Sequence, residues 1–328
     1  MRETKRVPGF YLLIVMLFLH SCDQSSEEQE RTGRAYYLSL AGDDANPGTK
    51  ESPWKSIAKL NAVTLNPGDT VYLKEGQVFE GSLQLDSTDS GSEDNPVVVT
   101  SDGAGKATIN AGNSSAIAIT FANNIKISNL HLVGSGRKAG NIESGLVVKN
   151  NSATIVVDSI EVEGFQKSGL LIYSSSDIKI DHVHAHDNGA AGISVGGYNS
   201  KTDSRNIIIR NSLAENNPGD PTNLTNHSGN GIIVGLCSNV LIEYCVATNN
   251  GWDMPRIGNG PVGIWAYEAD KVTIQNCISY RNKTSNGGED GGGFDLDGGI
   301  TNSAIQYCLT YENEGSGFGI FQYEGASV

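Results

Sequence analysis

The sequence is poor in basic residues, in helical patterns and in paired cysteines, and each shortage excludes a class of protein. It has 23 Lys and Arg against 37 Asp and Glu, a net charge of −14. We therefore expect no nucleic-acid partner, because binding phosphates requires clustered cations. No amphipathic helical pattern occurs after residue 65, which argues against alternating βαβ units. The five cysteines include no Cys-x-x-Cys pair, so a zinc site of that type is not expected.

Residues 1–21 have the features of an export signal. Three basic residues among the first six precede the apolar run 10–19, which is too short to span a membrane as a helix. The run ends in Leu19-His20-Ser21-Cys22, which resembles a bacterial lipoprotein processing site. The resemblance implies a lipid on Cys22, an acidic flexible tether at 22–34, and an extracytoplasmic protein anchored to the outer membrane or cell surface. A plain secretory signal is the alternative.

Residues 35–110 read as an N-terminal cap followed by first coils. Pro53–Leu60 fits a short amphipathic helix, and Pro67-Gly68-Asp69 is a turn before the strand Thr70–Leu73. This order resembles the N-terminal cap of secreted right-handed parallel β-helices such as pectate and alginate lyases. The resemblance implies the pectate-lyase-like solenoid fold and a carbohydrate substrate.

Residues 111–328 contain a repeated pair of strands. The first strand has the form x-Ile-x-Ile, as in Asn124–Ile127 and Asp177–Ile180, and the second begins at a glycine. The glycines that start the second strand lie 23 to 39 residues apart, at Gly145, Gly169, Gly192, Gly231, Gly263, Gly293 and Gly317. Such spacing leaves no room for crossover helices, so we predict an all-β, right-handed, single-stranded parallel β-helix with a short N-terminal capping helix.

Stacked coils should place like residues above one another. Eight positions after the last strand isoleucine, five successive coils carry asparagine, at Asn188, Asn217, Asn250, Asn282 and Asn313. This predicts an asparagine ladder, whose amides bond from coil to coil. Three positions after the isoleucine stand Cys245, Cys277 and Cys308, which we expect to be packed thiols rather than disulfides.

The stretch Gly291–Gly299 is the main candidate for chemistry. In its strand Phe294 and Leu296 should face the core, so that Asp295 and Asp297 share the outer face. Stacking extends this face to Trp265 and Tyr267 in the preceding coil and to Phe321 in the following one. We expect Trp265 and Tyr267 to be exposed and to stack on sugar rings beside the acids. Glu268 lies just beyond them and is a further catalytic candidate.

Three long loops, 218–230, 251–261 and 283–292, should wall this face. They carry further candidate residues: Trp252 and Arg256 for substrate binding, and His227, Asp253, Glu289 and Asp290 as other side chains able to close over it.

Three mechanisms remain open for this face. In a lyase, calcium held by Asp295 and Asp297 would acidify a uronate proton and a Lys or Arg would remove it. The strand at Asp295 is similar to one in a class of pectate lyases that carries a catalytic lysine there, and Arg256, Arg281 or Lys283 are the available replacements. In a hydrolase, Asp295 and Asp297 would act as acid and carboxylate. A non-catalytic glycan-binding or structural β-helix is the third reading.

Two further features complete the sequence reading. His182, His184 and His186 alternate, a pattern able to bind a divalent metal, although the segment is expected near a turn of its coil. The chain ends at Val328 with no capping element after the strand 318–323, so we expect the solenoid to be incomplete there.

Overall fold

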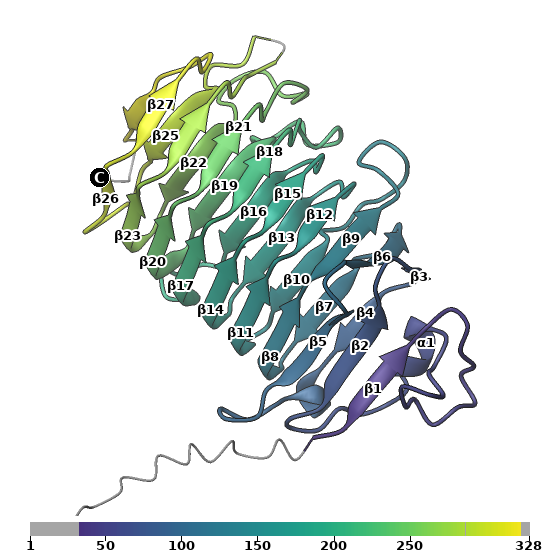
Figure 1. The fold of residues 1–328 in the computed structure, drawn as a ribbon. Helices are drawn as coiled ribbons and strands as arrows, with labels where there is room; N and C mark the ends of the chain where they lie inside the picture. Colours follow the sequence, from purple (N-terminus) through teal and green to yellow (C-terminus); the bar gives the residue numbers. More distant parts are fainter. Residues whose placement is uncertain (1–32, 286, 323–328) are drawn as a thin grey trace, which may run out of the picture. The chain divides into compact units, whose positions relative to one another are not determined.

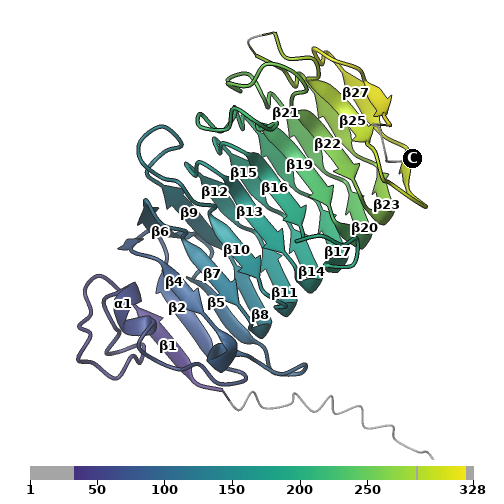
Figure 2. The ribbon, with the colours of Figure 1, turned by 180° about the vertical axis from the view of Figure 1, so that it is seen from behind.

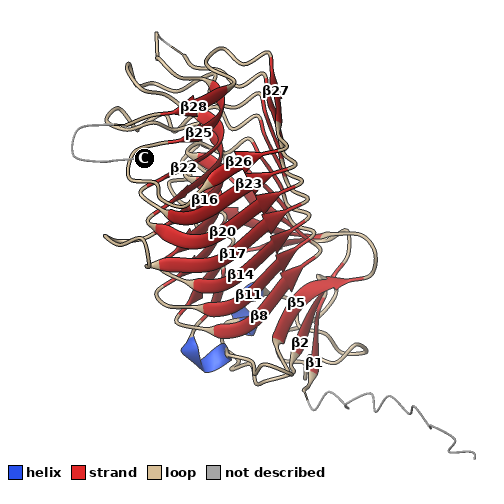
Figure 3. Ribbon diagram, turned by 90° about the vertical axis from the view of Figure 1, so that its left-hand side faces the viewer, coloured by secondary structure: helices blue, strands red, loops and turns tan. Residues whose placement is uncertain are grey.

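Each coil from β2 onward contains three strands rather than the predicted two, and the coils stack into three parallel sheets (Figures 1 and 2). The computed structural model describes residues 33–285 and 287–322. The predicted signal, Cys22 and most of the tether lie outside these residues. The predicted right-handed parallel β-helix is confirmed, and helical turns are confined to the N-terminal coils (Figure 3).

The three sheets are named A, B and C in the order in which a coil visits them. Sheet A is made of β1 (Ala35–Leu38), β2 (Thr70–Lys74), β5 (Val97–Asp102), β8 (Asn123–Ser128), β11 (Ala153–Asp158), β14 (Ser176–Asp181), β17 (Ser204–Arg210), β20 (Cys237–Glu243), β23 (Asp270–Gln275) and β26 (Ala304–Gln306). Sheet B is made of β3 (Val78–Glu80), β6 (Ala107–Gly112), β9 (Leu130–Gly134), β12 (Glu161–Glu163), β15 (His184–His186), β18 (Leu213–Glu215), β21 (Val246–Thr248), β24 (Ile278–Tyr280) and β27 (Leu309–Tyr311). Sheet C is made of β4 (Leu83–Leu85), β7 (Ile117–Thr120), β10 (Leu146–Lys149), β13 (Ser168–Tyr173), β16 (Ala191–Gly196), β19 (Asn230–Gly235), β22 (Val262–Tyr267), β25 (Gly292–Leu296) and β28 (Phe318–Ile320).

The core fills the space enclosed by the three sheets. Alternate residues of each strand point into it, so Ile178 and Ile180 of β14 are fully buried while Lys179 between them is exposed. Sheet A carries the isoleucine strands and sheet C the glycine strands. The β-branched side chains stack coil on coil, and this continuous apolar column is the main stabilising element of the solenoid.

The coils bend at residues with left-handed backbone conformation. Between sheets A and B every coil from β8 to β27 has one non-glycine residue with φ of 50–57°, and three of these seven are asparagines. Asparagine tolerates this region better than most residues because its short polar side chain bonds locally. His182 is one of the seven, so it lies in the turn, whereas His184 and His186 lie in strand β15.

The asparagine ladder is confirmed at the turn that follows sheet B. Each side-chain amide donates to the oxygen of the next asparagine, with N–O distances of 2.9 Å from Asn217 to Asn250 and from Asn250 to Asn282. The described cysteines are all free thiols, and Cys245, Cys277 and Cys308 form the predicted column.

The N-terminal cap closes the first coils. Helix α1 (Ile57–Leu60) is shorter than predicted, and the Ser56 hydroxyl accepts from the Lys59 N–H at its start. A 3₁₀ turn, η1 (Ser87–Asp89), follows β4. Trp54 is buried and stacks on Tyr36 of β1. Within the described part of the chain, no helix has the length and apolar character needed to cross a membrane.

Candidate active site

The predicted columns on sheet C have the predicted register. Asp295 of β25 pairs with Trp265 of β22 on one side and with Gly319 of β28 on the other. Its neighbours Phe294 and Leu296 belong to the core, so Asp295 points outward from the β-helix. The alternation read from the sequence therefore gives the correct face.

The outer face of sheet C is covered at this point, so the prediction that Trp265 is exposed is wrong. Trp265 is 4% exposed, and its indole N–H donates to Asn230 Oδ1 at 2.9 Å. The ring of His227 packs edge-on against it at 4.7 Å between centroids. With Ala191, Ile233, Val262 and the partly buried Tyr267, it forms a second, smaller apolar cluster outside the main core. An indole buried here is stabilised by contact and by its single hydrogen bond.

The cover consists of the three long loops, which bond to one another in the same order as the coils beneath them. The backbone N–H of Asp253 donates to Pro218 O at 2.8 Å, and that of Gly291 donates to Pro261 O at 2.9 Å. The Gly260 N–H donates to Asp290 Oδ2 at 2.7 Å. The loops are thus layered one on another along the stack, and the loop 218–230 covers Trp265 through His227.

Asp295 is a buried carboxyl group with little compensation: the backbone N–H of Leu296 favours its charged form, but burial outweighs this contact. It is 5% exposed, and its Oδ1 has no hydrogen-bond partner. Burial, and then the charges of Asp297 and Asp290, raise its pKa from 3.8 to about 8. A pKa of about 8 favours the protonated form of Asp295 at pH 7. A carboxylic acid that stays protonated at neutral pH is able to donate a proton to a bound substrate.

Two further acids lie at the carboxyl ends of the adjacent strands. Asp297 follows β25 directly, is partly exposed, and accepts from the Gly298 N–H at 2.7 Å. Glu268 follows β22, and its backbone N–H donates to Gly298 O at 2.9 Å. Both acids therefore contact the same turn, one coil apart.

The cover supplies a neutral imidazole, a guanidinium and a third aspartate. Burial, and then the charge of Arg256, lower the pKa of His227 to about 4, so His227 is neutral at pH 7. Burial, and then the charges of Asp297 and Glu289, raise the pKa of Asp290. The charge of Arg256 lowers this pKa but does not offset the rise. His227, Arg256 and Asp290 therefore influence one another electrostatically, and their closing over the site stays a prediction.

Trp252 and Asp253, which were expected to close over the face, are engaged elsewhere. The Trp252 indole donates to Asn216 Oδ1 at 2.9 Å, and the guanidinium of Arg137 lies 5.8 Å from its ring centroid. Asp253 forms ion pairs with Arg137 and Lys138. These contacts tie the loop 251–261 to earlier coils, so Trp252 has a structural explanation.

A protein-family model matches nearly the whole chain. The model of the Pel9A-like right-handed β-helix region matches residues 36–325. The chain belongs to this Pel9A-like family.

Known proteins similar to this Pel9A-like chain include enzymes. It is 33% identical over 159 residues to a lacto-N-biosidase of Bifidobacterium longum subsp. longum, an alignment that covers 44% of this chain but 9% of that protein. A GH136 lacto-N-biosidase from Eubacterium ramulus superposes with a TM-score of 0.70 at 19% identity, covering 89% of this chain and 58% of that one. The pectate lyase Pel9A superposes with a TM-score of 0.57 at 18% identity, covering 90% and 78%. The two structural likenesses establish the fold alone.

Two glycines of the Pel9A-like coils, Gly235 and Gly319, leave room for aromatic rings on sheet C. A Cβ at Gly235 would lie 2.2 Å from the ring of Tyr267, so that ring lies directly over Gly235. A Cβ at Gly319 would lie 2.4 Å from the Phe321 ring and 3.1 Å from Asp295 Oδ1. Phe321 is 48% exposed and is the aromatic face beside Asp295 that solvent can reach.

Two of the three cations proposed to replace a lyase base, Arg256 and Arg281, differ in their surroundings. Arg256 acts electrostatically on His227 and Asp290, as described above. Arg281 is paired with Glu312 at 2.7 Å and lies beside Tyr280 of sheet B. Arg256 is therefore the candidate of these two that acts on groups of the site.

Calcium binding by Asp295 and Asp297 stays a prediction. Among residues 33–285 and 287–322, the groups of three His, Cys, Asp or Glu ligand atoms within 4.8 Å of one another do not include either aspartate. A protonated Asp295 is also a poor ligand for a hard cation.

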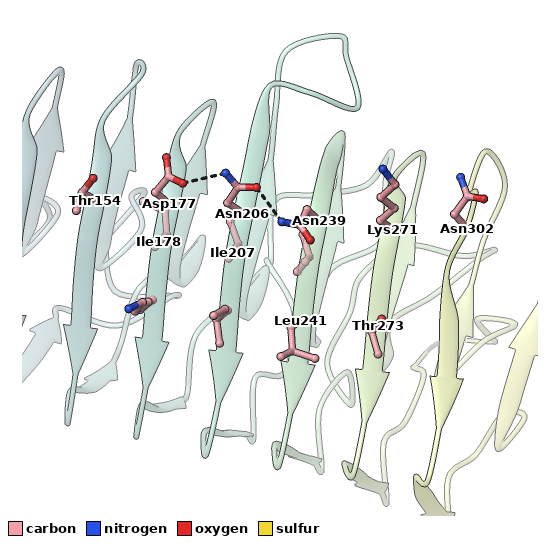
Figure 4. Close-up of a pocket in the computed structure, with 13 residues that line it drawn as sticks. Thr154, Asp177, Ile178, Asn206, Ile207, Asn239, Leu241, Lys271, Thr273 and Asn302 are labelled. Carbon is pink, nitrogen blue, oxygen red and sulfur yellow. Dashed lines mark hydrogen bonds between the residues drawn. The ribbon is translucent and has the colours of Figure 1, made fainter.

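A surface groove lies on sheet A, away from Asp295. It has a volume of about 610 Å³ and crosses strands β14, β17, β20 and β23 (Figure 4). A second polar ladder runs along it, from Asn239 to Asn206 and on to Asp177 at 2.8 and 2.9 Å. The ladder residues have left-handed backbone conformation, so this groove follows from the bend of the coils.

Proposed function

We propose that this chain is the β-helix region of a cell-surface carbohydrate-active enzyme that hydrolyses glycosidic bonds in an oligo- or polysaccharide. Asp295 acts as the general acid and Asp297 as the second carboxylate. The observation that carries the proposal is the buried carboxyl of Asp295, whose Oδ1 has no hydrogen-bond partner, next to a second, partly exposed aspartate. The named activity of the Bifidobacterium relative, a biosidase, supports the same class of substrate.

The chemistry requires one group in each protonation state. Protonated Asp295 donates its proton to the glycosidic oxygen as the bond to the anomeric carbon breaks. Ionised Asp297 either attacks that carbon or takes a proton from the attacking water. Glu268, at the end of the adjacent strand, is the alternative second carboxylate. Phe321 and the exposed part of Tyr267 offer ring faces to the sugar, and Arg256 would orient an acidic or hydroxyl substituent.

The direct test is a panel of oligo- and polysaccharides incubated with wild type, Asp295→Asn and Asp297→Asn. We expect new reducing ends with wild type and a loss of about 10²–10⁴-fold in either variant, because general acid–base catalysis contributes that much. Asp94→Asn is the matched control, since Asp94 is exposed on a loop of the N-terminal coils. Wild-type activity retained by Asp295→Asn would remove the proposal.

A lyase is the second candidate, favoured by the Pel9A-like family and by Arg256 near the site. In that case Asp295 and Asp297 hold calcium and Arg256 takes the proton. Product absorbing in the ultraviolet, together with loss of activity in a chelator, would identify β-elimination. Binding to a glycan without any product would support the non-catalytic alternative instead.

We also propose that the chain is anchored to the outer membrane or cell surface through Cys22. The lipoprotein-like sequence Leu19–Cys22 motivates this placement. Metabolic labelling with a fatty acid should modify wild type and leave Cys22→Ala unlabelled and released from membranes. Equal labelling of both proteins would contradict the anchor.

A further inference from the structure

A group of histidines and glutamates covers the outer face of sheet B, on the sheet next to the proposed active site. Strands β12 and β15 lie side by side there (Figure 1) and pair Glu161 with His184 and Glu163 with His186. The residues between them, Val162 and Ala185, are fully buried in the core. Strict alternation therefore turns all four polar side chains to the same outer surface.

Each of the two histidines has one ring nitrogen held by a carboxylate. His186 Nδ1 lies 2.7 Å from Asp187 Oδ2, and His184 Nε2 lies 2.8 Å from Glu215 Oε1. A histidine that binds a metal commonly donates its second ring N–H to a carboxylate in this way, which fixes the tautomer and strengthens the ligand. The other nitrogen of each ring then keeps its lone pair.

The remaining nitrogen of His186 is buried and unsatisfied. His186 Nε2 has no hydrogen-bond partner and lies 3.7 Å from Glu161 Oε1. Two ligands on a tetrahedral zinc ion with bonds of 2.0–2.1 Å are about 3.4 Å apart, so a shift of a few tenths of an ångström would bring both atoms onto one ion. Ligand atoms of Glu161, His184 and His186 all lie within 4.8 Å of one another.

The charges around this group favour a dication. Glu161, Glu163, Asp187 and Glu215 face the two rings, and the cation that pairs with them is Lys106, 3.2 Å from Glu161 Oε2. His131 of β9 lies on the far side, with Nε2 3.0 Å from Glu163 Oε1. Four carboxylates around two imidazoles and one ammonium group give this face an excess of negative charge that a bound dication would offset.

We propose that Glu161, His184 and His186 bind a single first-row divalent transition-metal ion, zinc being the reference case. Two imidazoles and one carboxylate suit zinc, nickel or copper, whereas calcium and magnesium prefer sets made entirely of oxygen. Asp187 and Glu215 orient the two imidazoles. The ion links coil β12 to coil β15, so it stabilises the stack and takes no part in the chemistry at Asp295.

The test measures zinc binding to the tag-free chain after treatment with a chelator. Zinc is titrated against a chromophoric zinc chelator, and cobalt is added separately for its absorption spectrum. We expect one zinc per chain, visible bands from cobalt in a four-coordinate nitrogen–oxygen site, and no competition from millimolar calcium. Zinc should also raise the melting temperature of the chain.

Three variants locate the site. His186→Ala and Glu161→Gln should lose tight zinc binding, and Asp187→Asn should weaken it about 10–100-fold because it removes the orienting carboxylate. His182→Ala is the matched control: His182 is 62% exposed and paired with Asp181, outside the proposed ligand set. Circular dichroism of the metal-free variants checks that each one folds.

The outcomes decide the proposal. No binding of zinc by wild type, unchanged affinity in both His186→Ala and Glu161→Gln, or equal displacement by calcium would each overturn it. Loss of binding in His182→Ala to the same degree as in His186→Ala would also overturn it, because a general surface effect would then explain the result.

Discussion

Replacing Asp295 by asparagine should stabilise the fold, and the gain should grow as the pH rises. The unfolded chain loses the Asp295 proton near pH 4, whereas the folded chain loses it near pH 8. Between these values the folded state holds an extra proton, so raising the pH costs it stability relative to the unfolded state. Asparagine has a similar shape and does not titrate, so the variant escapes this penalty.

The size of the effect follows from the two pKa values. Between pH 5 and pH 9 the free energy of unfolding of the variant should gain about 4 kcal/mol on that of wild type. Any fixed cost of the buried amide is the same at both pH values and cancels in this difference. Urea unfolding of both proteins at pH 5, 7 and 9, followed by circular dichroism, measures it.

Two results of this experiment would contradict a raised pKa of Asp295. A difference that does not change with pH would mean that Asp295 is ionised in the folded state at neutral pH. A difference that is flat with calcium but grows with pH in a chelator would mean that a cation compensates the carboxylate, as in the calcium-dependent lyase. Repeating the titration with calcium and with a chelator separates these two cases.

Three other substitutions test the packing around the site and along the stack. Asn250→Ala removes a fully buried amide whose partners would be left unpaired, and should cost about 2–4 kcal/mol in urea unfolding; a loss near zero would refute the ladder's contribution. Trp265→Phe deletes the indole N–H bonded to Asn230 and should cost about 1–3 kcal/mol with little change in KM, whereas a large rise in KM would show direct contact with substrate. Gly319→Ala places a Cβ 2.4 Å from the Phe321 ring and 3.1 Å from Asp295 Oδ1, and should lower kcat by displacing both groups; unchanged kinetics would argue that neither group is involved.

Much of the fold is predictable from the sequence because a stacked solenoid repeats its local rules. The spacing of Gly263 and Gly293 gives the pairing of Trp265 with Asp295 directly, and the asparagine count gives the ladder. Sheet B was missed because its strands are mostly three residues long, which is too short to show alternation. His184 and His186 were consequently expected near a turn, whereas they lie in a strand.

The burial of the site could not be predicted in the same way. Sequence periodicity shows that Asp295 and Trp265 leave the core, but it does not show what covers them. The cover depends on hydrogen bonds between loops more than twenty residues apart, such as Gly260 to Asp290. Loop paths of this kind carry no local pattern, so the same side chains were expected to be exposed and proved to be enclosed.

The parallel pairing of all three sheets has a mechanical consequence. Every interstrand hydrogen bond joins one coil to the next, so these bonds are aligned along the stacking axis. A pulling force applied to the chain would therefore break the interstrand hydrogen bonds of an outermost coil one after another. The bonds would not all be loaded together in shear. We expect single-molecule stretching to show a series of small steps, each releasing one coil of 23 to 39 residues. A molecule of this kind yields coil by coil under tension, while its interior stays folded.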